Sequence, residues 1–321
     1  MAKGLRLMNF VCVPFIPYVP FVPENGAEIS QNPPLVGYFS LPENDKSDRQ
    51  IVKGLEDNLS CGQSLLTLSS DLMHELLEHP ERVSTVKKLY TERGASCRCA
   101  HSDWGEGNEM SLPFEGDRKR MIERVKRTLE LTAEFGGDTC AFHAETWSNE
   151  SLRPRKLEQW RAYIDDALEA VLPVAERCGV IVALENIWTQ IAMPEELNGF
   201  VKRFSSPWLG LCFDAGHANV MSASGKRSCE WLPWACRDSG VIPFDDHILD
   251  KMLPNIVTVH LHDNASDTDS HDIPGHGTID WKTVMGKLKT APRLRSYQHE
   301  VSISFGYSAK TILDAFKPLF A

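Results

Sequence analysis

The sequence predicts an α/β protein folded as a closed (β/α)8 barrel, also called a TIM barrel, and three observations lead to this class. Short apolar runs alternate with amphipathic segments eight times from Val36 onward, which is the pattern of parallel strands joined by helices. The chain has 321 residues, enough for eight such units in one domain. No G-x-G-x-x-G turn follows the first apolar run, which disfavours an open dinucleotide-binding sheet.

The expected elements follow this rhythm along the chain. The eight strands are predicted at residues 36–40, 64–68, 96–100, 139–143, 180–185, 209–214, 256–260 and 296–300. Residues 120–135 and 156–178 repeat apolar side chains every three or four positions, which predicts amphipathic helices. Gly179 is a typical stop for the second helix, and Pro173 predicts a kink inside it.

Composition and charge exclude several classes of protein. Hydrophobic residues make up 42% and charged residues 24% of the chain, which excludes a largely disordered protein. The formal net charge of −10 argues against nucleic acid as a partner. No apolar run reaches the roughly 18 residues that a membrane span needs, so no membrane association is expected. Nine cysteines without zinc-ribbon spacing indicate reduced thiols of a cytoplasmic protein.

Residues 1–35 are expected to form an extended arm outside a single barrel domain at residues 36–321. A proline stands at every third position from Pro14 to Pro23, the spacing of a polyproline II helix. These prolines interrupt an apolar stretch that otherwise has the features of an export signal. The arm would pack on the barrel or on a second copy of the chain, which leaves a homo-oligomer open.

Acidic and imidazole side chains collect where the predicted strands end. In a barrel of this class the carboxyl ends of all strands meet at one mouth, where function resides. The side chains are His101, His143, Glu185, Asp214, His260 and Glu300 at or beside strand ends, and His217, Asp269 and His271 in the following loops. Mixed nitrogen and oxygen donors on a rigid rim predict a site for a divalent metal.

Four of these residues form the core of the predicted metal site. A single strand-end histidine or aspartate often only caps a helix. Crowding Glu185, Asp214 and Glu300 around His260 without a cation would cost several kcal/mol in repulsion and desolvation. Carboxylates mixed with imidazoles suit Mn²⁺, Zn²⁺, Co²⁺ or Fe²⁺. We expect one such ion, and up to three if the other residues are also ligands.

The local motifs resemble those of a known family. V-A-L-E-N, F-D-A-G-H, V-H-L-H-D-N, P-G-H-G-T-I-D-W and a late H-E are similar to motifs of the xylose-isomerase-like barrel superfamily. The resemblance covers roughly Val36 to the C-terminus. This superfamily contains sugar and sugar phosphate isomerases and epimerases, and also apurinic endonucleases of the endonuclease IV type. The motifs are typical of the superfamily and leave the reaction open.

The resemblance first implies a metal-dependent sugar isomerase or epimerase. In such members the positions matching the four core residues hold one metal, and those matching Glu185 and Glu300 move a proton through an enediolate. The position of His217 contacts substrate oxygens, and small sugars are the substrates. Ketose 3-epimerases keep a glutamate and an arginine where this chain has Ile191 and Ser266, so the sugar is open, as is whether it is phosphorylated.

The resemblance also implies an alternative, a multi-zinc phosphodiesterase. Endonuclease members hold a three-zinc cluster with nine ligands, and all nine chemical types stand at the matching positions in this chain. Against this, D-A-G-H replaces their D-T-C-H, and the basic run at 118–127 is expected to face solvent on a barrel helix. A metal-free binding protein is disfavoured by the intact carboxylates.

The long segment at residues 218–251 is expected to shape the pocket, because loops after the strands of such barrels commonly cover the active face. It contains Trp231 and Trp234. These indoles are candidates to stack on a sugar, with packing of the loop on its own apolar residues as the equal alternative.

Overall fold

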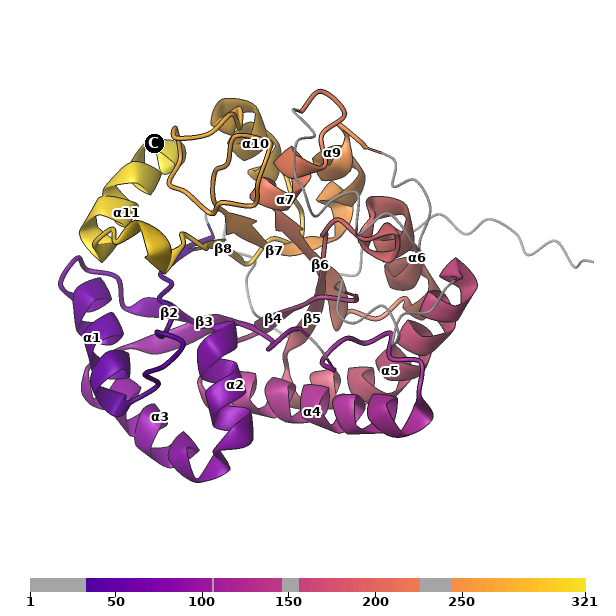
Figure 1. Cartoon of the computed structure of the whole chain (residues 1–321), viewed down its shortest axis with the longest axis horizontal. Helices are drawn as coiled ribbons and strands as arrows, with labels where there is room; N and C mark the ends of the chain where they lie inside the picture. Colours follow the sequence, from indigo (N-terminus) through magenta and orange to yellow (C-terminus); the bar gives the residue numbers. More distant parts are fainter. Residues whose placement is uncertain (1–32, 106, 146–155, 226–243) are drawn as a thin grey trace, which may run out of the picture.

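A computed structural model describes residues 33–105, 107–145, 156–225 and 244–321 of the chain. Eight parallel strands lie at the centre and helices surround them (Figure 1), so the predicted (β/α)8 class is confirmed. Most of the proline-rich arm lies outside the described residues, as do Trp231 and Trp234. The division into arm and barrel, and the contact of the two tryptophans with a sugar, stay predictions.

The strands follow one another around the barrel in sequence order. Their bounds are Leu35–Val36 (β1), Leu65–Leu68 (β2), Ser96–His101 (β3), Thr139–Phe142 (β4), Ile181–Glu185 (β5), Leu209–Asp214 (β6), Ile256–Leu261 (β7) and Ser296–His299 (β8). The spatial order is β1-β8-β7-β6-β5-β4-β3-β2. A parallel bridge from Gly37 to Leu66 joins β1 to β2, so the sheet closes on itself.

This closure requires a glycine at position 37. The Gly37 N–H donates to the Leu65 carbonyl at 2.9 Å, and its carbonyl accepts from the Thr67 N–H at 2.8 Å. A Cβ atom at Gly37 would lie 2.6 Å from the side chain of Asn58, so only glycine allows so close an approach. After Gly37 the chain leaves the sheet, which makes β1 shorter than the strand predicted at residues 36–40.

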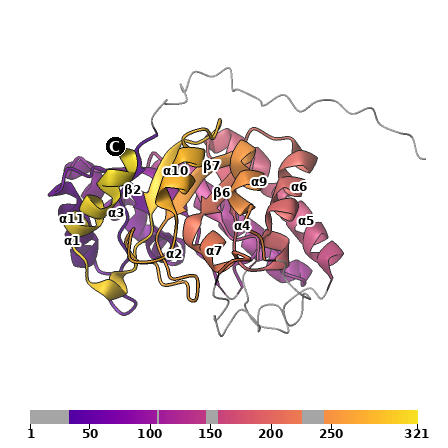
Figure 2. The ribbon, with the colours of Figure 1, turned by 90° about the horizontal axis from the view of Figure 1, so that it is seen from above.

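The helices form the outer layer. Their bounds are Asp48–Leu59 (α1), Ser70–Glu78 (α2), Val83–Glu92 (α3), Glu115–Glu134 (α4), Leu157–Cys178 (α5), Pro194–Phe204 (α6), Ala215–Val220 (α7), Ile248–Met252 (α9), Trp281–Leu288 (α10) and Ala309–Phe316 (α11). Figure 2 shows α10, α9 and α6 following one another along one side. No helix in the described part of the chain has the length and apolar character that crossing a membrane requires.

The two helices predicted from periodicity are α4 and α5. Helix α5 ends at Gly179, whose φ of 67° is left-handed, as expected for a glycine stop. Helix α4 begins five residues before the predicted residue 120, because Glu115 and Asp117 in its first turn favour the positive end of the helix. Pro173 lies within α5, and the kink expected there stays a prediction.

A small apolar cluster fills the barrel below its mouth. It consists of Ala141, Ile181, Ala183, Cys212 and Val257. Ile181, Ala183 and Glu185 alternate along β5 and therefore share one face of the strand. The carboxylate of Glu185 is itself fully buried above this cluster and the buried hydroxyls of Thr258 and Ser296, so its interactions with other charges are strong.

Candidate metal centre at the mouth of the barrel

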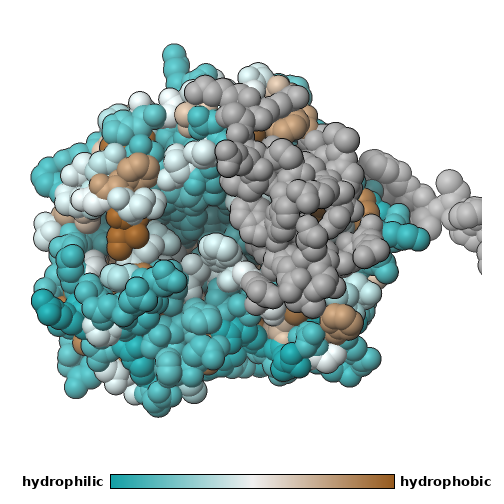
Figure 3. All heavy atoms as spheres, in the orientation of Figure 1, coloured by the Kyte–Doolittle hydropathy of each residue, from teal (hydrophilic) through white to brown (hydrophobic). Residues whose placement is uncertain are grey.

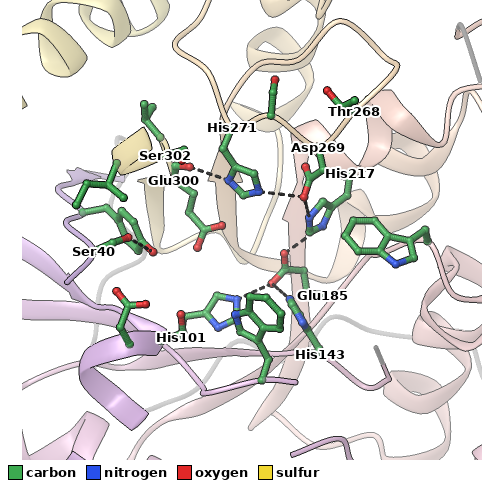
Figure 4. Close-up of a pocket in the computed structure, with 18 residues that line it drawn as sticks. Ser40, His101, His143, Glu185, His217, Thr268, Asp269, His271, Glu300 and Ser302 are labelled. Carbon is green, nitrogen blue, oxygen red and sulfur yellow. Dashed lines mark hydrogen bonds and ion pairs between the residues drawn. The ribbon is translucent and has the colours of Figure 1, made fainter. Parts of the chain in front are cut away.

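Nine predicted site residues gather at the carboxyl ends of the strands. Glu185 and Asp214 are the last residues of β5 and β6, and His260 is the second-last residue of β7. Glu300 follows β8 directly, as His143 follows β4. Figure 4 shows Glu185 near the centre, with His101, His143 and His217 pointing toward it. The rest are His101, His217, Asp269 and His271, which line the same pocket.

The four core residues have the spacing of ligands around one ion. His260 Nδ1 lies 3.1 Å from Glu185 Oε1 and 3.4 Å from Glu300 Oε2. It lies 3.8 Å from Asp214 Oδ2. Two ligands bound tetrahedrally to a first-row ion stand about 3.4 Å apart, so the distances fit. Glu185, Asp214 and His260 are 0% exposed and Glu300 is 8% exposed.

Four buried atoms of this set make no hydrogen bond within the described residues. Both carboxylate oxygens of Glu185 and both ring nitrogens of His260 are buried without a hydrogen bond. Buried polar atoms in folded proteins are almost always paired, and leaving them unpaired is costly. A divalent cation bound to Glu185 and to His260 Nδ1 would satisfy the carboxylate oxygens and this nitrogen, so the residues fit the implied metal.

Two further donor sets adjoin the first. His101 Nε2 and His143 Nε2 lie 3.3 Å and 3.5 Å from Glu185 Oε2, and His101 forms one set with Glu185 and His260. On the other side, Asp269 Oδ2 lies 3.3 Å from His217 Nε2 and 3.1 Å from His271 Nε2. His262 belongs to this last set. The mouth therefore holds donors for more than one ion.

Backbone carbonyls fix the orientation of three site histidines. His101 Nδ1 lies 2.7 Å from the Ser102 carbonyl, His217 Nδ1 lies 2.9 Å from the Asn186 carbonyl, and His271 Nδ1 lies 2.7 Å from the Glu300 carbonyl. A carbonyl only accepts, so Nδ1 carries the proton. Nε2 of each neutral ring then keeps its lone pair toward the pocket, as in metal-binding histidines.

Side chains from neighbouring strands hold the carboxylates. Gln298 Nε2 donates to Glu300 Oε1 at 2.7 Å, which leaves Oε2 free to face His260. The side chain of Asn186 pairs with the backbone of Asp214, donating at 3.0 Å and accepting at 2.8 Å. This pair explains the asparagine of V-A-L-E-N, because it fixes the ends of β5 and β6 side by side.

His262 is a site residue that the sequence-based prediction missed. Its ring is fully buried, and Nε2 lies 2.9 Å and 3.1 Å from the two oxygens of Asp214. It also stacks on the His271 ring, with centroids 3.6 Å apart. The signal was present in V-H-L-H, because residues two apart in a strand point to the same side. His260 and His262 therefore both face the mouth.

The glycine of D-A-G-H makes room for this ring. A Cβ atom at Gly216 would lie 1.9 Å from His262 Cε1, closer than any real contact. The cysteine of D-T-C-H would therefore overlap the ring. The glycine at position 216, which replaces the cysteine of the endonuclease motif, therefore leaves the space that a histidine at position 262 needs.

The P-G-H-G-T-I-D-W motif is structural. The buried Asp263 carboxylate accepts from Gly275 N at 2.9 Å, Ile279 N at 3.3 Å and Trp281 Nε1 at 2.9 Å. His276, which replaces a usual glutamate, is half-exposed beside Tyr307. The motif therefore fixes the ends of the loop that carries Asp269 and His271. Its own residues do not line the pocket at the mouth.

The charges of the apo site are strongly coupled. Burial disfavours the charged form of Glu185, but His260 and His143 outweigh it and hold the pKa of this carboxyl well below its usual range. Burial likewise opposes protonation of His260, yet Glu185 and Glu300 raise its pKa to about 9. Asp269 raises the pKa of His271 to about 9 against the same opposition. At neutral pH His260 and His271 therefore carry protons when no metal is bound. Metal binding would displace these protons.

We expect the metal-free protein to lose stability as pH rises. The raised pKa values of His260 and His271 contribute stability that is complete below about pH 6.5 and disappears as pH passes 9. Urea unfolding of chelator-treated protein between these pH values should show a loss of several kcal/mol. The metal-saturated protein is the control and should change little. Rising stability of the metal-free protein over this range would contradict the charge assignment.

A cavity of about 600 Å³ opens above the donor sets. Figure 3 shows the hollow near the centre of the face, surrounded mainly by hydrophilic residues. Its far wall consists of Tyr38, Ser40, Ser70 and Asp71, and Trp104, Trp188 and Ile303 add apolar surface. Within the described residues, no lysine or arginine lines it.

The basic run on α4 is paired with acids on the barrel's outside. Arg118 contacts Asp166 at 3.1 Å, and Lys126 contacts Glu123 at 2.7 Å. The other basic residues of the run that have acidic partners are Lys119, Arg120, Arg124 and Arg127. Their charge is locally neutralised, as expected for a solvated helix face.

Known proteins similar to this chain share its fold. A family model described as "Xylose isomerase-like TIM barrel" matches residues 69–293. An uncharacterised protein of Methanocaldococcus jannaschii is 27% identical over 204 residues, covering 59% of this chain and 59% of the relative. One of Sinorhizobium fredii is 21% identical over 191 residues, covering 58% and 50%. This chain therefore spans about half to three fifths of these relatives' lengths.

Solved structures give the same fold. The 3-keto-D-glucoside 4-epimerase of E. coli superposes with a TM-score of 0.62 at 20% identity, covering 89% of this chain and 98% of that one. D-psicose 3-epimerase from Clostridium cellulolyticum gives a TM-score of 0.64 at 14% identity, covering 89% and 91%. Such identities establish a shared fold. Together with the match of the family model over most of the barrel, they show that this chain belongs to the xylose isomerase-like TIM barrel family.

Proposed function

We propose that this protein is a divalent-metal-dependent isomerase or epimerase that acts on a small sugar. The observation that carries the proposal is the placement of two carboxylates, Glu185 and Glu300, around one donor set at the floor of the cavity. Their oxygens lie 3.1 Å and 3.4 Å from the same nitrogen, His260 Nδ1. The sugar epimerases among the similar structures support the same class.

Glu185, Asp214, His260 and Glu300 would hold the ion, and their mixed donors suit Mn²⁺, Zn²⁺, Co²⁺ or Fe²⁺. When bound, a divalent ion supplies a Lewis acid that polarises a sugar carbonyl and stabilises the negative charge developing on its oxygen. Glu185 is fully buried, which would strengthen its interaction with the bound ion. The unpaired atoms of Glu185 and His260 support this ligand assignment.

The two glutamates would move the proton. One takes it from the carbon next to the carbonyl, which leaves the sugar as an enediolate. The proton returns either from the same glutamate or from the other one, which must then enter the step protonated and leave it ionised. Return to the neighbouring carbon gives an isomer, and return to the opposite face of the same carbon gives an epimer. Gln298 occupies Glu300 Oε1, so Oε2 is the oxygen that acts. His143 and His217 would hydrogen-bond sugar hydroxyls from the rim.

Solvent deuterium exchange tests this function. The metal-reconstituted protein, incubated with a panel of ketoses and keto-glucosides in D₂O, should incorporate deuterium at a carbon next to the carbonyl. The variant Glu300→Gln should lower this rate by about 1,000-fold, because the amide cannot carry the proton. Glu81→Gln, an exposed change on the outer surface, is the matched control. Exchange that is undiminished in Glu300→Gln would remove this glutamate from the mechanism.

A second candidate is a multi-zinc phosphodiesterase. It is favoured by the separate donor set of His217, Asp269 and His271, and opposed by the absence of lysine and arginine from the described cavity wall. Elemental analysis separates the candidates, since one ion per chain supports the isomerase and three support the phosphodiesterase. Metal-dependent cleavage of an abasic-site duplex, without deuterium exchange into any sugar, would replace the first proposal by the second.

A further inference from the structure

We propose that Tyr38, Ser40, Ser70 and Asp71 form a hydroxyl-binding subsite that selects an unphosphorylated sugar. The inference rests on the proposed function and adds the substrate class. Tyr38 and Ser40 follow β1, and Ser70 and Asp71 begin α2 directly after β2. All four line the same cavity as the metal-binding residues. In Figure 4, Ser40 lies across the pocket from His217, with Glu300 between them.

The phenol of Tyr38 is set up as a hydrogen-bond donor. Its backbone N–H donates to His299 Nε2 at 3.1 Å, and its hydroxyl accepts from Ser40 Oγ at 3.0 Å. Burial raises the pKa of Tyr38, and the nearby charges of Glu300 and Asp71 raise it further. The phenol therefore keeps its proton at any physiological pH. Its oxygen accepts from Ser40, the Ser70 hydroxyl also interacts with the phenol, and the O–H would turn to a sugar oxygen when one is bound.

Asp71 supplies the complementary acceptor. Its Oδ2 accepts from Leu41 N at 2.7 Å, which holds the half-buried carboxylate in place at the cavity wall. A carboxylate accepts strongly from hydroxyl groups. Tyr38 and Asp71 thus present one donor and one anionic acceptor, a pair suited to the free hydroxyls at the end of a sugar away from the metal.

The same carboxylate disfavours a phosphate. Asp71 lies in the first turn of α2, so a carboxylate already occupies the positive end of the helix, where an anion would otherwise bind. Asp71 is the charged residue among the four, and no lysine or arginine of the described segments lines the cavity. A phosphate dianion placed here would face the Asp71 carboxylate, and the described part of the cavity wall offers it no cationic side chain.

Paired ligands test this selectivity on the full metal-reconstituted chain. Calorimetric titration should show that D-fructose, D-xylulose and D-ribulose bind at least about 10-fold more tightly than their terminal phosphate esters, as one charge-assisted hydrogen bond predicts. Asp71→Asn keeps the acceptor for Leu41 N and removes the charge. It should weaken binding of the neutral sugars by about 10-fold. It should also reduce the ratio between the dissociation constants of the esters and those of the neutral sugars.

Two more variants provide a second test of the subsite and a control. Ser40→Ala should weaken neutral-sugar binding without touching the backbone contact of Asp71, so it tests the subsite even if Asp71→Asn misfolds. Glu78→Gln, at the exposed end of α2, is the matched control and should bind like the wild type. For a sugar that turns over, Asp71→Asn should raise KM and leave kcat within about threefold, because it lies away from the reacting carbon.

The outcomes separate this inference from the proposed function. Neutral sugars that bind through Asp71 without deuterium exchange would support the subsite and overturn the isomerase. Deuterium exchange with a preference for phosphate esters would support the isomerase and overturn the subsite. The subsite is also overturned if the neutral sugars and their esters all fail to bind, or if neither Asp71→Asn nor Ser40→Ala changes neutral-sugar binding.

Discussion

Replacing Glu185 with glutamine is expected to abolish stoichiometric metal binding and to lower turnover by at least about 1,000-fold. Glu185 is the residue on which the site is centred. Its oxygens lie 3.3 Å from His101 Nε2, 3.5 Å from His143 Nε2 and 3.4 Å from His217 Nδ1. They also face His260 at 3.1 Å. Two of the three candidate donor sets include it, so a single substitution removes a charged ligand from both.

The measurement is elemental analysis after dialysis, combined with the deuterium exchange assay. Glu185→Gln should retain less than about a tenth of the wild-type metal, since a carboxylate contributes far more to a cation site than an amide. Glu123→Gln, on the exposed surface of α4, is the matched control and should retain all of it. Full metal content with unchanged exchange in Glu185→Gln would refute both the ligand role and the catalytic role of Glu185.

Replacing Gly216 with alanine is expected to disturb the metal site through His262. The new methyl group would occupy the space of the His262 ring, 1.9 Å from Cε1, and would push Nε2 away from Asp214. Loss of a partner that orients a metal ligand typically lowers metal affinity by about 10–100-fold. Overpacking a buried position should also cost about 1–3 kcal/mol of unfolding free energy.

A double variant isolates the cause. In Gly216→Ala/His262→Ala the ring that clashes is gone, so the alanine at 216 should cost little further stability, with a coupling of about 1 kcal/mol or more. Gly286→Ala is the matched control, because a Cβ atom at this glycine of α10 meets nothing within 4 Å. It should be neutral or stabilising. Urea unfolding and metal titration supply both quantities, and strictly additive losses would contradict the proposed contact.

The sequence was sufficient to locate Glu185, Asp214 and His260 at one mouth because the fold class itself imposes the convergence. Once eight strands run parallel around a barrel, the residues that end them meet, whatever the details of packing. The same reasoning placed Glu300 at the end of the last predicted strand, and it lies one residue beyond β8. What these residues bind, and how many ions they hold, are not consequences of the barrel and stay proposals.

Contacts between distant segments could not be predicted in the same way. The His262 ring packs closely against the backbone of Gly216, 46 positions away along the chain. Neither residue is unusual by itself in the sequence. Tyr38 and Asp71 lie after β1 and β2 among common turn and helix-start residues, and only their shared cavity gives them meaning. His262 is different, since the two-residue spacing in V-H-L-H was sufficient to place it on the same face as His260, although the prediction did not use it.

The anchoring of the segment after β7 has a consequence for how relatives diverge. Asp263 accepts hydrogen bonds from Gly275, Ile279 and Trp281. These bonds hold the two ends of the segment 264–274 together. The middle of the segment contacts the barrel through His271, whose Nδ1 lies 2.7 Å from the Glu300 carbonyl and whose ring stacks on His262. Asp269 and His271 lie in this segment, whereas the four core residues lie at strand ends. We therefore expect relatives to differ in Asp269 and His271 more often than in the core residues.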